Sequence, residues 1–140
     1  METQFTSLRE KIAAESKARR ERYAQFRAVY DRAYAAGLAA GNNAIPTPMV
    51  VTDAMHGKQW YVEDGACGFA WIRVRPATSS FARWLLKEKI VSGRSYNGGV
   101  DIWISDHNQS VTRKEAHARA MADVLRSELG INCYADSRLD

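Results

Sequence analysis

One run of eight residues, 98–105, most constrains what this chain can fold into, because its side chains alternate with a period of two. Such alternation is typical of a β-strand, in which successive side chains point to opposite sides. One face would hold Val100, Ile102 and Ile104, and the other Asp101, Trp103 and Ser105. Helical patterns lie on both sides of this run. We therefore expect a central strand in a sheet that carries helices.

The N-terminal segment 6–40 predicts one long helix, or two in line, because strong helix formers dominate and only Gly37 interrupts them. Residues 15–22 are polar on every side and are expected to be solvated. Two groups of apolar residues at helical spacing flank this stretch: Phe5, Leu8 and Ile12 on one side, and Tyr23, Phe26, Tyr30, Ala33 and Tyr34 on the other.

Two interpretations of this segment are open. The helix could be frayed at its N-terminus and pack only through residues 23–38. Alternatively, residues 1–40 form an arm whose Phe5, Leu8 and Ile12 contact a partner, including a second copy of the chain in a homodimer.

The next segment, 41–57, is rich in Gly, Asn and Pro and predicts a linker, with a short edge strand at 49–51. Residues 58–62 and 68–74 each have strand character, and a turn containing Gly65 joins them. We expect these two strands to pair as an antiparallel hairpin.

The remaining elements alternate between helix and strand. A helix is predicted over 80–90, then the strand described above, then a helix over 112–129. Thr112 and Glu115 match a capping box at the start of that helix, and Gly130 is placed to end it. A last strand at 131–134 and a polar tail at 135–140 follow. The predicted fold class is α+β: a long N-terminal helix, then a globular domain over 58–140 with a β-hairpin followed by β-α-β-α-β.

Composition is that of an ordinary globular protein, with 46% hydrophobic and 26% charged residues in 140. There is no apolar run of about 20 residues and no basic, apolar leader, so we expect a cytoplasmic protein that contacts no membrane. Cys67 and Cys133 are most simply two reduced thiols, and a single disulfide between them is the alternative. No cofactor is expected.

The net charge of +4 is unevenly distributed. Residues 73–94 carry six basic side chains against Glu88 alone, whereas 41–72 and 95–140 are each net negative. Such a block attracts anionic partners, but a total this small does not require nucleic acid. The basic candidates for a binding site are Arg73, Arg75, Arg83, Lys87 and Arg94.

The polar face of the predicted sheet is the main candidate site. If strands 68–75 and 100–105 pair, one face gathers Phe69, Trp71, Arg73, Arg75 and Trp103. Aromatic rings interleaved with arginines form a stacking platform for single-stranded nucleic acid. The alternative is that the N-terminal helix covers this face, with Tyr23, Phe26 and Tyr30 on the tryptophans, while Asp101 neutralises Arg73 across the strands.

The histidines give a weaker signal. His56, His107 and His117 fit no zinc-binding spacing, so no metal site is expected. His107 and His117 could meet beside Asp106 and provide acid–base chemistry. The alternative is that His117 is buried on its helix and His107 lies in a solvated turn.

Several motifs together resemble a family of small proteins encoded by tailed bacteriophages, over about residues 58–140. They are Cys67 to Trp71, Ser80 to Leu85, Gly98 to Val100, Gln109-Ser110 with Arg113 to Ala116, and Gly130-Ile131 with Ser137 to Asp140. The resemblance implies a phage origin and action in the cytoplasm of a bacterial host. It supplies no catalytic residue, and the N-terminal helix lies outside it.

Two classes of function follow. The first is a non-enzymatic phage accessory protein that binds a macromolecule, with nucleic acid favoured over a host defence or metabolic protein that it would inhibit. The second is a small enzyme that uses His107 and His117. For the first class the candidate binding residues are Trp71 and Trp103 together with the five basic residues named above.

Overall fold

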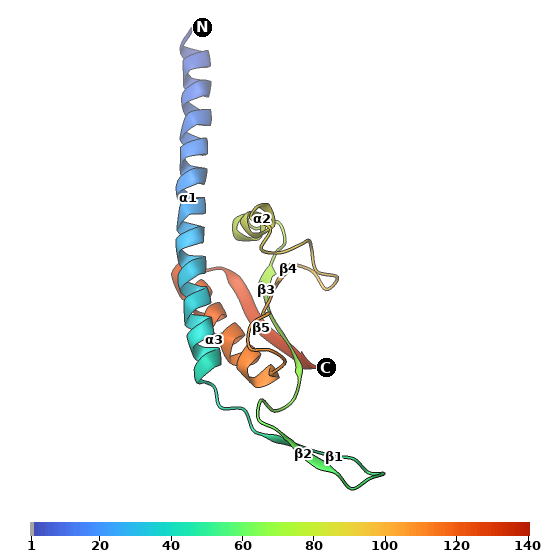
Figure 1. Ribbon diagram of the computed structural model, residues 1–140. Helices are drawn as coiled ribbons and strands as arrows, with labels where there is room; N and C mark the ends of the chain where they lie inside the picture. The colour runs from blue at the N-terminus through green and yellow to red at the C-terminus, as the bar shows by residue number, and fades with distance from the viewer. Residues whose placement is uncertain (1) are drawn as a thin grey trace.

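The computed structural model describes residues 2–140, with side chains from Ser7 onward, and confirms the α+β fold. Figure 1 shows a long N-terminal helix beside a small sheet, with a hairpin extending from the end of the body opposite the N-terminus. The elements in order are α1 (Glu2–Asn43), β1 (Met49–Thr52), β2 (Gln59–Val62), β3 (Gly68–Arg75), α2 (Ser80–Lys87), β4 (Val100–Trp103), α3 (Val111–Leu129) and β5 (Asn132–Leu139).

The main sheet has three antiparallel strands in the order β4-β3-β5. β3 is therefore the central strand, and the prediction that residues 98–105 form it is wrong. β4 is an edge strand, continued by one further hydrogen bond from the Ile104 amide to the Ala70 carbonyl at 3.0 Å. Alternation predicted the strand and its two faces correctly, but it carries no information about which strands lie on either side.

The C-terminal residues 135–140 are not a polar tail. β5 pairs with β3 along its whole length, from Arg75 opposite Asn132 to Gly68 opposite Leu139. Ala135 and Ser137, which follow Cys133 on the inward face, are small, and Ser137 donates a hydrogen bond from Oγ to Glu115 of α3 at 2.9 Å. A strand whose inward residues are this small lacks the apolar signal on which strand prediction depends.

The hairpin also has a different partner from the one predicted. β2 pairs with β1, from Met49 opposite Val62 to Thr52 opposite Gln59, and not with residues 68–74. β1 lies inside the stretch predicted as a linker, where it confirms the short strand predicted at 49–51. The turn of this hairpin is closed by a hydrogen bond from the Asp53 amide to the Lys58 carbonyl at 2.7 Å. The Gly65 turn instead leads the chain from the hairpin to the main sheet.

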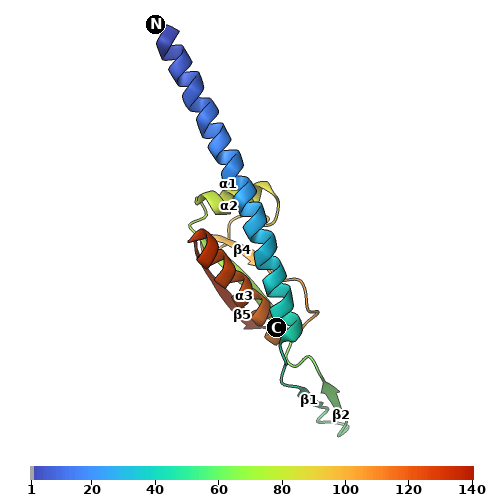
Figure 2. The same cartoon turned by 90° about the vertical axis from the view of Figure 1, so that its left-hand side faces the viewer.

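The core lies on the aliphatic face of the main sheet, where α1 and α3 run side by side (Figures 1 and 2). α3 contributes a buried stripe of Ala118, Met121, Ala122 and Leu125. α1 packs on the same side, because Phe26 and Tyr30 lie with their rings 6.0 and 5.9 Å from the ring of buried Trp84. The proposal that α1 covers Trp71 and Trp103 on the opposite face is therefore wrong.

Capping differs from prediction at the start of α3. Ser110, not Thr112, is the N-cap, and its Oγ accepts a hydrogen bond from the Arg113 amide at 3.3 Å. Glu115 contacts Ser137 of β5 instead of reaching back to the helix start. Gly130 ends the helix in the left-handed region, as predicted. α2 begins after its N-cap Ser79, as expected for a helix starting at residue 80, and ends at Lys87, three residues earlier than expected.

The N-terminal half of α1 projects from the body (Figures 1 and 2). Between Ser7 and Arg22 every side chain except half-buried Ser16 is exposed, including Leu8 and Ile12, so the solvated stretch is confirmed. The Phe5 side chain lies outside the described residues. Contact of this arm with a second copy or another partner stays a prediction. In the described part of the chain, no helix has the length and apolar character needed to cross a membrane.

Candidate nucleic-acid interface

The face of the main sheet opposite the core gathers the predicted aromatic and basic residues. In the part of the chain that the structure describes, no helix lies over it (Figure 1). Its members are Phe69, Trp71, Arg73 and Arg75 of β3, Asp101 and Trp103 of β4, and Tyr134, Asp136 and Arg138 of β5. We refer to this set of residues as the open face.

Three of the four aromatic side chains of the open face form one cluster, and the fourth, Tyr134, has its ring 5.8 Å from Cζ of Arg75. Trp71 and Trp103 are directly opposite each other, with ring centroids 4.9 Å apart, and Phe69 meets Trp103 edge-on at 6.3 Å. Trp71 is only 9% exposed, whereas Trp103 is 52% exposed and Tyr134 is 37% exposed. Trp103 and Tyr134 therefore have ring surface available to a ligand, and Trp71 packs against Trp103.

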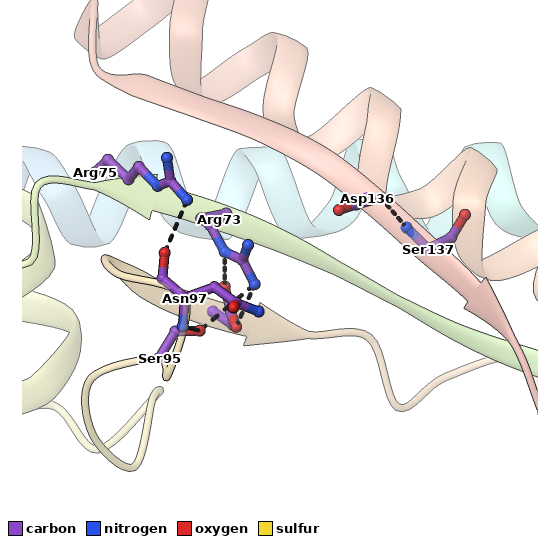
Figure 3. Close-up of polar contacts among 7 residues, drawn as sticks. Arg73, Arg75, Ser95, Asn97, Asp136 and Ser137 are labelled. Carbon is purple, nitrogen blue, oxygen red and sulfur yellow. Dashed lines mark hydrogen bonds and ion pairs between the residues drawn. The ribbon is translucent and has the colours of Figure 1, made fainter.

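Arg73 is held inside the protein by a cross-strand ion pair. Its Nε donates to Asp101 Oδ1 at 2.8 Å and its Nη2 to Asp101 Oδ2 at 3.1 Å, so the pair is bidentate (Figure 3). The hydrogen bond to Asp101 raises the pKa of Arg73 above its usual range. The predicted neutralisation of Arg73 by Asp101 is confirmed. Arg73 is consequently a structural residue of the open face and not a free cation for a ligand.

Arg75 fixes the loop before β4. Its Nη2 donates to the carbonyl oxygen of Asn97 at 2.9 Å (Figure 3). Gly99 lies against the backbone of Val74 with a φ of 71°, and a Cβ there would overlap the Val74 carbonyl oxygen. The loop 92–99 is thus attached to β3 at its base. Its tip carries Tyr96, which is fully exposed.

The basic block of residues 73–94 is divided among three places: β3, which carries Arg73 and Arg75, helix α2 with its C-terminal end, and the loop before β4. Lys87 of α2 lies with Nζ 5.0 Å from the ring of Tyr23 on α1, and Arg83 is exposed on the same helix. Arg94 is exposed in the loop beside β4. On the open face, Arg138 lies with Cζ 5.2 Å from the ring of Phe69. Two aromatic or basic members of the open face, Tyr134 and Arg138, were not predicted. Tyr134 lay in the strand predicted at 131–134, but that strand was not placed beside β3, and Arg138 lay in the predicted tail.

The two histidines meet as predicted. His107 Nε2 and His117 Nδ1 are 3.0 Å apart, beside Asp106, which accepts a hydrogen bond from the Tyr34 hydroxyl at 2.7 Å. His117 is fully buried. Two glycines one turn apart on α1 make room for the imidazoles, since a Cβ at Gly37 would overlap His117 and one at Gly41 would overlap His107.

This histidine pair is part of the packed interior and has no features of a catalytic site. Burial lowers the pKa of both imidazoles, and the proximity of His107 lowers that of His117 further. The hydrogen bond to Asp106 raises the pKa of Tyr34 to about 12. Neutral imidazoles pressed against helix backbone give no substrate access to His117. Within the described residues, no three His, Cys, Asp or Glu side chains are grouped so as to hold a metal ion.

Lowering the pH below about 6.5, the ordinary histidine pKa, is expected to destabilise the protein. Below that pH the two histidines become protonated in the unfolded chain but stay neutral in the folded protein, because their folded-state pKa values are lower. The contribution of the pair to the free energy of unfolding is therefore largest above about pH 6.5 and decreases as the pH falls towards the folded-state pKa values. Asp106 opposes this effect, while Arg113 and Lys114 add to it for His107. The measurement is the urea unfolding midpoint between about pH 8 and about pH 5.5.

His107→Asn is the matched variant, because asparagine tolerates the φ of 71° at this position. The variant should lose less stability than the wild type over the same pH range. Equal losses in the two proteins would show that the pair does not take part in the pH dependence.

Comparisons with protein-family models, curated proteins and solved structures found no match to this chain.

Proposed function

We propose that the protein binds single-stranded nucleic acid through the open face. The observation that carries the proposal is the exposure of Trp103 and Tyr134 on a sheet face that no described helix covers. Each base of an unpaired strand has an apolar face, and stacking on an aromatic side chain contributes about 1–3 kcal/mol per base.

Charge supports the same ligand. Arg138 and Arg94 lie on and beside the open face with side chains that reach solvent. Asp101, which would repel a phosphate, is paired with Arg73. Asp136 is the remaining exposed carboxylate of the set, so the open face has an excess of positive charge that attracts a phosphate backbone without base specificity.

The shape of the open face favours a single strand over a duplex as the ligand. Bases in a duplex are stacked on one another, so their faces cannot reach Trp103 or Tyr134. The open face also presents aromatic rings rather than a helix that would enter a groove. The resemblance to phage proteins suggests the setting, a non-enzymatic accessory role in an infected bacterial cell.

A protein partner is the second candidate, and hairpin β1–β2 favours it. A two-stranded hairpin alone is marginally stable in water, yet this one projects from the body and exposes Val50, Trp60 and Tyr61. These side chains offer an apolar surface to a host protein. Acid–base catalysis by His107 and His117 is not supported by a comparable observation.

The test is an electrophoretic mobility shift with single- and double-stranded oligonucleotides of the same sequence, at about 50 mM and about 200 mM salt. We expect the single strand to bind more tightly and the affinity to fall with salt. Trp103→Ala should weaken binding by about 5- to 150-fold, the equivalent of one lost stacking contact of about 1–3 kcal/mol.

Trp60→Ala is the matched control, because Trp60 on the hairpin and Trp103 on the open face are both 52% exposed. This variant should bind nucleic acid like the wild type. Absence of salt-dependent binding, or a larger loss with Trp60→Ala than with Trp103→Ala, would contradict the proposal.

A further inference from the structure

Two hollows adjoin at the edge of the open face, on either side of loop 92–99. The larger, of about 510 Å³, is lined by Trp71, Trp103, Tyr96, Asn97 and Arg138 among others. The smaller, of about 290 Å³, lies between the end of α2 and β4 and includes Lys89 and Arg94. Ser95, Asp101 and Trp103 line both hollows, so the two share a wall.

The larger hollow has the chemistry of a nucleobase site. Three of its residues are aromatic, and Asn97 and Ser95 can exchange hydrogen bonds with the polar edge of a base. Trp71, another lining residue, is only 9% exposed and adds to the apolar part of the wall.

The smaller hollow has the chemistry of a phosphate site. Lys89 and Arg94 supply two cationic residues, and residues 90–93 lie between them in the wall. The carboxylate in the shared wall, Asp101, already accepts both hydrogen bonds from Arg73 and does not leave a free negative charge. An anion can therefore bind here with little repulsion.

We infer that these two hollows together hold one unpaired nucleotide of the bound strand, with its base in the larger hollow and a neighbouring phosphate in the smaller. This inference rests on the proposed function and adds a defined subsite to it. Tyr96 provides the second ring of the base site, since it is fully exposed at the tip of a loop flanked by Gly93 and Gly98. The base lies between Tyr96 and Trp103, and Arg94 and Lys89 fix the phosphate.

The experiment uses the full chain and a fluorescently labelled single strand of about 12 nucleotides. Tyr96→Ala should weaken binding by about 5- to 150-fold, while Tyr96→Phe, which retains the ring, should bind like the wild type. Arg94→Glu should weaken binding and flatten the dependence of affinity on salt by about one unit in the log–log slope. Arg83→Glu, the same charge change on α2, should have a smaller effect on both.

A second readout isolates the subsite. A nucleoside 5′-monophosphate added at millimolar concentration should quench tryptophan fluorescence of the wild type and of Trp60→Ala, and quench Tyr96→Ala less. If no single strand binds the wild type, the proposed function fails and the subsite with it. If the strand binds but Tyr96→Ala and Arg94→Glu bind it like the wild type, the nucleotide subsite is overturned while the proposed function stands.

Discussion

Removal of residues 132–140 is expected to abolish cooperative folding, because these residues form β5 and not a tail. Without β5 the central strand β3 would lose its partner along eight residue pairs, from Gly68 to Arg75. The main sheet would be reduced to β3 and the four-residue β4, and two-stranded sheets are at best marginally stable. The deletion also uncovers α3, whose Arg126 donates from Nη1 to the Cys133 carbonyl at 2.9 Å.

The measurement is circular dichroism during thermal unfolding, with removal of residues 1–18 as the matched control. That control deletes about twice as many residues, but every described side chain that it removes is exposed except half-buried Ser16, so it should keep a single cooperative transition. If the shortened N-terminal variant sizes as a monomer where the full chain is a dimer, the arm is an oligomerisation element. A cooperative transition after loss of residues 132–140 would contradict the role given to β5.

The contrast between the two chain ends shows what the sequence can and cannot predict about this fold. The polar stretch 15–22 correctly indicated a solvated helix, because a helix that packs needs an apolar stripe. Residues 135–140 are equally polar, yet they form a strand, because backbone pairing with β3 and small inward side chains suffice at a sheet edge. Local pattern determines which face is buried. It does not determine which strand pairs with which, and for this reason β4 was expected at the centre and β2 beside β3.

The same limit applies to the candidate site: the sequence predicted which residues share a face but not all of the strands that contribute to it. Alternation placed Trp71, Arg73 and Trp103 on one face, and the register of β3 and β4 brings Trp71 opposite Trp103 and Arg73 opposite Asp101. The contribution of β5 depended on recognising that strand. The hydrogen bond from Arg75 to the Asn97 carbonyl joins a strand to a loop 22 residues later, and no short-range pattern in the sequence predicts such a contact.

Replacement of Leu125 by alanine is expected to lower the free energy of unfolding by about 2–5 kcal/mol. Leu125 is fully buried on α3, in the core cluster that also contains Phe26 of α1 and Val74 of β3. Truncation removes apolar contacts and leaves a cavity that neighbouring side chains from several elements fill only in part. The measurement is urea unfolding of both proteins with a common m-value.

Arg119→Ala is the control on the same helix. The Arg119 side chain is 72% exposed, and its one ion pair, to Glu115, has an N–O distance of 3.6 Å, so its removal should change stability by less than about 0.5 kcal/mol. A cost below about 1 kcal/mol for Leu125→Ala would mean that α3 does not bury this face against α1 and the sheet. Because the open face is the opposite side of that same sheet, such a result would also remove the support on which Trp71, Trp103 and Tyr134 are held.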